Sequence, residues 1–135
     1  MATQGKRILV IDDEKDQVDY LTALLTDLGY VVDTAGNGNQ AMDKLKAAPA
    51  DLITLDVVMP DKTGVKFYRE LKDAPAFQRI PVIFITGITP DFEKFISNRR
   101  SAPAPEGYLA KPFEPQALTD LVKKLLDEAG KEKTA

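Results

Sequence analysis

Short apolar runs alternate along the chain with segments in which apolar residues recur at helical spacing. The apolar runs are too short for helices and predict strands at residues 7–11, 31–35, 51–56, 81–86 and 108–111. Helical spacing and turn residues predict the intervening helices: one that ends at Gly29, one through Leu45 that ends before Pro49, one from about Gly64 to Lys72, one around Phe92 and Phe95, and a last one through Leu118 to Leu126.

This alternation of strands and helices predicts the class of fold. Residues 51–56 and 81–86 are continuously apolar, which is typical of central parallel strands covered on both faces. Parallel strands need crossover helices, so the pattern predicts an α/β domain with a doubly wound five-stranded parallel sheet and five helices. A chain of 135 residues fits a single domain, which we place at residues 6–128 with polar tails at 1–5 and 129–135.

The charged residues narrow the choice of partners. The chain carries 21 acidic and 18 basic residues, mixed along its length, and a formal net charge of -3. No basic region is present that would bind nucleic acid or an anionic membrane, so neither partner is expected. The chain has no apolar run near the roughly 18 residues that span a bilayer, and its first residues lack the apolar core of a signal peptide, so a cytoplasmic location is expected.

The chain contains neither histidine nor cysteine, and this absence excludes several kinds of chemistry. A Ser-His-Asp or Cys-His nucleophile pair, a zinc site of imidazoles or thiolates, and a phosphohistidine all need one of these residues. Any metal site must therefore use oxygen ligands, which favours Mg²⁺ or Mn²⁺.

Polar side chains lie at the carboxyl ends of four of the predicted strands, as the last residue of the strand or directly after it. They are Asp12 with Asp13, Asp56, Thr86 and Lys111. Because the carboxyl ends of parallel strands meet at one edge of a sheet, we expect these side chains to converge there. Three carboxylates in one place repel one another, so their convergence predicts a bound cation. Asp12 taken alone is equally suited to capping the helix that starts near Glu14.

Five motifs in this order resemble those of the receiver domains of bacterial two-component response regulators. The motifs are Ile11-Asp12-Asp13, Asp56 to Gly64, Thr86-Gly87, Tyr108, and Lys111-Pro112-Phe113. The resemblance extends over about residues 6–128. Within this family, the chain resembles the chemotaxis regulators. It implies a flavodoxin-like fold with strand order 2-1-3-4-5. The stretch 101–107 contains more proline than this family leads us to expect.

The resemblance implies a role for each site residue. Asp56 would be the phosphoacceptor, and Asp13, Asp56 and the backbone carbonyl of Val58 would bind Mg²⁺, with Asp12 as a further ligand or acting through bound water. Lys111 and Thr86 would contact the phosphoryl oxygens. Thr86 and Tyr108 would form the conformational switch.

The same resemblance implies the partners of the chain. A histidine kinase or a histidine phosphotransfer protein would donate the phosphoryl group, and an unknown downstream protein would read the result. The chain would be a regulatory domain that catalyses only its own phosphorylation and dephosphorylation, rather than an enzyme.

Two alternative functions follow from other features of the sequence. Gly36 to Ala41 fits the G-x-G-x-x-A pattern of dinucleotide-binding modules, although it lies in the second strand-to-helix turn and not the first. A phosphatase of the haloacid dehalogenase type also uses an aspartate nucleophile and Mg²⁺. Such enzymes carry a second aspartate two residues after the nucleophile, where this chain has Val58, so a leaving group would lack its proton donor.

Overall fold

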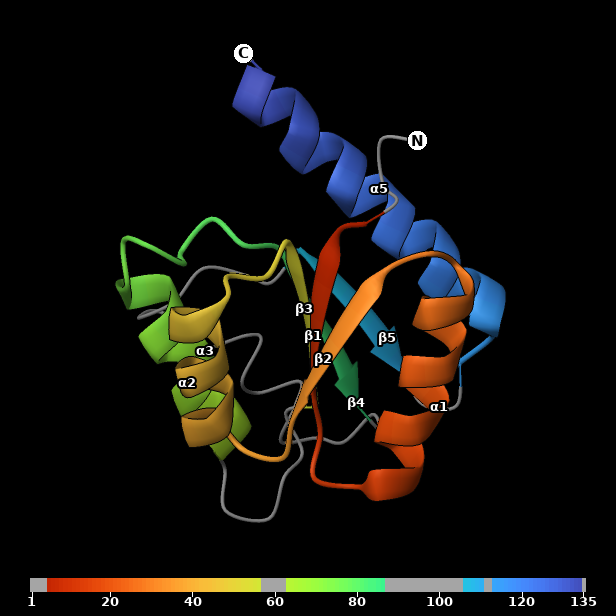
Figure 1. Ribbon diagram of the computed structural model, residues 1–135, viewed down its shortest axis with the longest axis horizontal. Helices are drawn as coiled ribbons and strands as arrows, with labels where there is room; N and C mark the ends of the chain where they lie inside the picture. The colour runs from red at the N-terminus through yellow and green to blue at the C-terminus, as the bar shows by residue number, and fades with distance from the viewer. Residues whose placement is uncertain (1–4, 57–62, 87–105, 111–112, 135) are drawn as a thin grey trace.

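A five-stranded parallel sheet forms the centre of the molecule and has helices on both faces (Figure 1). The computed structural model describes residues 5–56, 63–86, 106–110 and 113–134. The strands are β1 (Arg7–Ile11), β2 (Val31–Ala35), β3 (Leu52–Leu55), β4 (Val82–Thr86) and β5 (Gly107–Ala110). The helices are α1 (Lys15–Asp27), α2 (Gly38–Ala47), α3 (Thr63–Asp73) and α5 (Pro115–Thr134).

The order of the strands is β2-β1-β3-β4-β5, and every neighbouring pair is parallel. The doubly wound α/β fold and its strand order are therefore confirmed. Four of the five expected helices lie in the described part of the chain, and the one expected around Phe92 and Phe95 lies outside it. The last strand begins at Gly107, one residue earlier than the sequence suggested.

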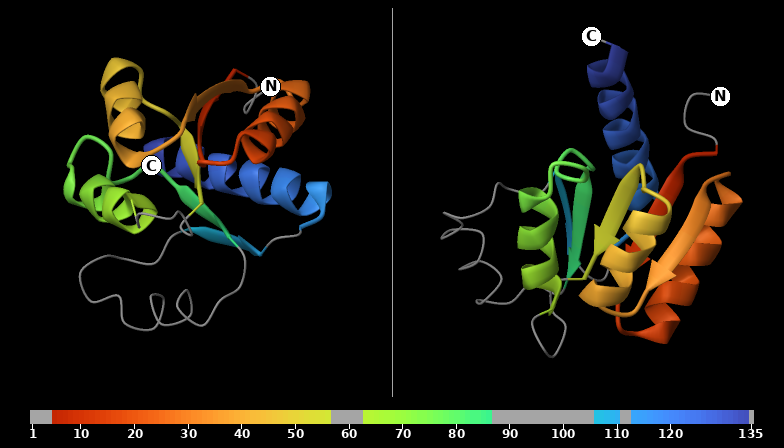
Figure 2. Two further views of the ribbon diagram at one scale, coloured as in Figure 1. Left: turned by 90° about the horizontal axis from the view of Figure 1, so that it is seen from below. Right: turned by 60° about the vertical axis from the view of Figure 1, so that its left-hand side comes forward.

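Alternate residues of the central strands β1, β3 and β4 enter two separate cores. Leu9 and Ile11 of β1 pack toward α2 and α3, whereas Ile8 and Val10 pack toward α1 and α5. Figure 2 shows these two helical layers on either side of the sheet. Because both faces are covered, the central strands have no polar face, which is why their sequences read as continuous apolar runs.

The end of α1 is fixed by a glycine, as the sequence predicted. Gly29 has a φ of 96°, a left-handed conformation that favours glycine. Its N–H donates to the carbonyl of Thr26, and the N–H of Tyr30 donates to the carbonyl of Leu25. These two bonds form a Schellman motif, which turns the chain directly into β2.

The last helix, α5, is longer than its apolar pattern predicted. Residues 129–134, expected to be a polar tail, continue α5 as far as Thr134. At 20 residues α5 is about 30 Å long, whereas the four residues of β5 span about 13 Å. The helix therefore projects past the sheet (Figures 1 and 2).

Gly107 allows β5 and α5 to pack closely, and we expect Gly107→Ala to destabilise the fold. A Cβ atom at this position would lie 2.8 Å from Cδ2 of Leu121, so Leu121 or the strand must shift. Overpacking of this kind costs about 1–3 kcal/mol. The free energy of unfolding from urea denaturation measures the effect. Gly36→Ala is the matched control, because its nearest contact would be 3.5 Å away, and an equal loss there would contradict the packing explanation.

Candidate phosphoacceptor and metal site

Two buried aspartates lie side by side at the carboxyl edge of the sheet. Asp12 follows β1 and Asp56 follows the adjacent strand β3, and only 3% and 4% of their surfaces are exposed. The N–H of Asp12 donates to the carbonyl of Ala35 at 3.1 Å, and the N–H of Asp56 donates to that of Ile11 at 3.0 Å. The backbone of both residues is therefore held by the neighbouring strand, and the two residues lie at one edge of the sheet, as the strand-end pattern predicted.

Asp13 and Glu14 complete an acidic cluster around this pair. One carboxylate oxygen from each of Asp12, Asp13, Glu14 and Asp56 lies within 4.8 Å of the others. All these donors are hard oxygens, and the buried pair gains from charge neutralisation, so the cluster could hold a divalent cation such as Mg²⁺. Asp12, Asp13 and Asp56 were expected in this cluster from their places at strand ends, whereas Glu14 was not expected there. Its position directly after Asp13, before the first turn of α1, was the available signal.

Asp12 also organises the turn into α1. Its Oδ1 accepts a hydrogen bond from the N–H of Glu14 at 3.0 Å, while Glu14 itself is the N-cap residue and makes no side-chain cap bond. Asp12 is therefore not the N-cap residue of α1, but it binds the backbone of that residue, and the same side chain belongs to the acidic cluster.

Removing the charge of Asp12 should stabilise the metal-free protein. Two like charges 4 Å apart repel by about 1 kcal/mol in water and about 4 kcal/mol at an effective dielectric of 20. Asp12→Asn keeps the acceptor for Glu14, so we expect its free energy of unfolding in EDTA to rise by about 1 kcal/mol or more. Asp12→Ala also loses the acceptor and should gain less. Urea denaturation tests this, and a loss of stability for Asp12→Asn in EDTA would contradict it.

The other predicted site residues are only partly within the described chain. Thr86 is the last residue of β4 and pairs with Ala110, the last residue of β5, so its backbone lies at the same edge as Asp56. Lys111 and Val58 lie outside the described residues. Tyr108 is 40% exposed on β5 and lies opposite Phe84 of β4.

The glycine-rich turn before α2 is occupied by its own side chains. Oε1 of Gln40 accepts the N–H of Gly36 at 2.9 Å, and Oδ1 of Asn37 accepts the N–H of Gln40 at 2.9 Å. A dinucleotide-binding turn instead offers such N–H groups to a pyrophosphate. The turn is therefore explained as a helix cap, which weakens the nucleotide-binding alternative.

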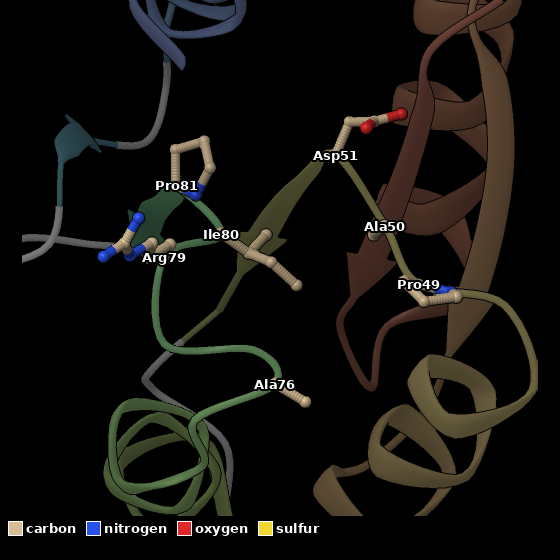
Figure 3. Close-up of a pocket in the computed structure, with 7 residues that line it drawn as sticks. All are labelled: Pro49, Ala50, Asp51, Ala76, Arg79, Ile80 and Pro81. Carbon is tan, nitrogen blue, oxygen red and sulfur yellow. The ribbon is translucent and has the colours of Figure 1, made fainter. Parts of the chain in front are cut away.

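A surface hollow lies at the opposite, amino-terminal edge of the sheet (Figure 3). It has a volume of about 240 Å³ and is lined by Pro49, Ala50, Asp51, Ala76, Arg79, Ile80 and Pro81. The side chains of Asp51 and Arg79 point to opposite sides, and Oδ2 of Asp51 accepts the N–H of Arg7 at 2.8 Å. Ligand sites have polar groups that converge, so the hollow is a weaker candidate than the acidic edge.

The described helices include none with both the length and the apolar composition needed to cross a bilayer. This agrees with the absence of a long apolar run in the sequence.

Solved structures similar to this chain include a receiver domain and a response regulator. A signal receiver domain of a histidine kinase from Syntrophus aciditrophicus is 31% identical, with a TM-score of 0.81 and 92% of each chain covered. The chemotaxis response regulator CheY4 of Vibrio cholerae is 29% identical, with a TM-score of 0.77, covering 90% of this chain and 99% of CheY4.

The curated relatives include longer proteins. The alkaline phosphatase synthesis transcriptional regulatory protein PhoP of Bacillus subtilis is 33% identical over 122 residues, which cover 90% of this chain but 49% of PhoP. The chain thus spans about half the length of that relative, and the expectation of no nucleic acid partner concerns this chain alone. The family model of the response regulator receiver domain matches residues 8–123. The chain belongs to the response regulator receiver domain family of two-component systems.

Proposed function

We propose that this receiver is a phosphoryl-accepting signalling switch in which Asp56 is the acceptor. The observation that carries the proposal is the placement of Asp56, a buried carboxylate at the carboxyl end of a central strand, within 4.8 Å of three further carboxylates. A buried carboxylate in such company is costly unless a cation neutralises it, and clusters of this kind are concentrated at functional sites.

The chemistry is a transfer between two nucleophiles. A carboxylate oxygen of Asp56 attacks phosphorus, the bond from phosphorus to the imidazole nitrogen of a phosphohistidine breaks, and the electron pair of that bond stays on the imidazole. When bound, Mg²⁺ or Mn²⁺ neutralises the charge that keeps carboxylate and phosphoryl oxygens apart. Asp12, Asp13, Asp56 and the backbone carbonyl of Val58 would hold the ion, and the structure adds Glu14 as a neighbour of this set.

Lys111 and Thr86 complete the proposed site. The ammonium of Lys111 and the hydroxyl of Thr86 would each donate to a phosphoryl oxygen, so that developing negative charge meets donors already in place. The pairing of Thr86 with Ala110 supports this role, because Lys111 follows Ala110 directly. Thr86 and Tyr108 would then respond to the new charge and change the surface that a downstream protein binds.

The proposed role is regulatory. Residues 6–128 would form the receiver unit, and a histidine kinase or a histidine phosphotransfer protein would supply the phosphoryl group. The chain would act catalytically only on its own phosphorylation and dephosphorylation.

Phosphotransfer profiling tests this proposal. The chain is mixed with a panel of radiolabelled phospho-histidine kinases and phosphotransfer proteins, with Mg²⁺ or with EDTA, and the label on the chain is followed in time. We expect rapid transfer from at least one donor, only with Mg²⁺. Equal transfer in EDTA, or none from any donor, would contradict the proposal. Steady product release from a generic phosphate ester would instead support the phosphatase alternative.

A further inference from the structure

Among the described residues, Tyr108 belongs to an aromatic stack that begins on α3. Its ring meets the ring of Phe84 edge to face, with centroids 6.0 Å apart and planes at 89°. Phe84 in turn meets Tyr68 of α3, with centroids 4.9 Å apart at 78°. Phe84 and Tyr68 are both completely buried, so the exposed ring of Tyr108 is supported from the core by two rings without solvent access.

A second connection between α3 and β5 runs through charged groups. Lys72 lies one turn after Tyr68, and its ammonium is 5.6 Å from the centroid of the Tyr68 ring. The Lys72 side chain is 6% exposed, and its Nζ lies 3.5 Å from Oε1 of Glu106. Oε1 of Glu106 also accepts the N–H of Val82 at 2.7 Å. Glu106 immediately precedes β5, so this pair anchors the start of the strand that carries Tyr108.

The Lys72 ammonium is also fixed from a third direction. It donates to the carbonyls of Gln78 and Ile80, at 3.2 Å and 3.3 Å, in the segment between α3 and β4. A buried ammonium held by two carbonyls, a carboxylate and a ring face has little freedom to move. The charged connection therefore joins α3, the segment after it and the start of β5 beside the ring stack.

We infer that α3 positions the Tyr108 ring, through Tyr68 and Phe84 on one path and through Lys72 and Glu106 on the other. Both paths leave α3 within one helical turn, and they end at Tyr108 of β5 and at Glu106 directly before β5. α3 begins at Thr63, directly after the residues 57–62 that follow Asp56. A displacement of α3 caused at the acceptor would thus reach Tyr108 without passing through Thr86.

The role of these two paths in signalling rests on the proposed function, whereas their test needs no phosphorylation. The chain has four tyrosines, Tyr20, Tyr30, Tyr68 and Tyr108. Their ring signals, labelled with ¹³C and assigned by single replacements with phenylalanine, can be followed by NMR in the unphosphorylated protein. Tyr20 and Tyr30 lie on the α1 and α5 side of the sheet and serve as internal controls.

The decisive variant is Tyr68→Leu, which removes the ring that supports Phe84. We expect the Tyr108 signal to shift more than the signals of Tyr20 and Tyr30. Tyr68→Phe keeps the ring and is the matched control, so its Tyr108 signal should stay at the wild-type position. Added to Phe84→Leu, Tyr68→Leu should shift the Tyr108 signal less than it does alone, because the ring between them is already gone and only the contact of the Tyr68 ring with Lys72 remains to be lost.

Lys72→Met tests the charged path and decides the question if Tyr68→Leu does not fold. It keeps an unbranched apolar side chain and removes the ammonium, so we expect the Tyr108 signal to shift while Tyr20 and Tyr30 stay in place. An unchanged Tyr108 signal in a folded Tyr68→Leu or Lys72→Met variant would overturn the inference, as would a Tyr68→Leu shift that persists in full beside Phe84→Leu. Loss of phosphotransfer would instead bear on the proposed function.

Discussion

Asp56→Asn is expected to abolish phosphoryl labelling of the chain. With Mg²⁺ and acetyl phosphate, the wild-type protein should gain the mass of one phosphoryl group, and the variant should gain none. The amide of asparagine has nearly the shape of the carboxylate but is not a competent nucleophile. Asp56 is 4% exposed, so a replacement of the same size keeps the packing around it. Intact-mass measurement reads the result directly.

Asp51→Asn provides the matched control for this experiment. Asp51 precedes the same strand, β3, at the opposite edge of the sheet, and its Oδ2 accepts the N–H of Arg7. Asparagine keeps that acceptor, so labelling should match the wild type. A label that persists in Asp56→Asn, or one that forms equally well in EDTA, would show that Asp56 is not the acceptor.

Phe84→Ala is expected to lower the free energy of unfolding by about 3–5 kcal/mol, the usual cost of removing a buried phenylalanine ring. Phe84 is completely buried and contacts rings on both sides, Tyr68 and Tyr108, so the cavity would open inside a rigid stack. Since small domains are stable by about 5–15 kcal/mol, this single change would remove a large part of the total. Urea denaturation with the unfolding slope compared to wild type measures it.

Val31→Ala is the control for a strand position without such packing. Val31 is 43% exposed on the edge strand β2, so its truncation should change the free energy of unfolding by no more than about 0.5 kcal/mol. A similar loss for Phe84→Ala and Val31→Ala would mean that the aromatic stack does not stabilise the fold beyond ordinary strand packing.

The sequence was most informative where local chemistry determines structure. The strand at residues 31–35 was predicted with its observed bounds, and Gly29 ends α1 as expected, because the left-handed conformation there needs a glycine. The convergence of Asp12 and Asp56 also followed from pattern alone, since parallel strands bring their carboxyl ends to one edge.

The features that were not predicted depend on contacts between distant segments. Lys72 and Glu106 are separated by 34 residues, and nothing local in either segment indicates that they pair. Tyr68 belongs to the apolar face of a helix, and such a pattern does not identify the strand residue that its ring will meet. The extension of α5 was missed because residues 129–134 are polar, although alanine, lysine and glutamate are good helix formers.

The hydrogen bond from the N–H of Val82 to the Glu106 carboxylate helps to set the register between β4 and β5. A slip of one residue between β4 and β5 would turn every β5 side chain to the other face. Tyr108 would then point to the side where Gly107 now lies, and where even a Cβ atom would come within 2.8 Å of Leu121. A larger side chain in the place of Gly107 would thus force Leu121 to shift, whereas the bond from Val82 to the Glu106 carboxylate stabilises the observed register. These two contacts favour one register for an edge strand of only four residues. The register in turn determines the face of the sheet on which Tyr108 lies.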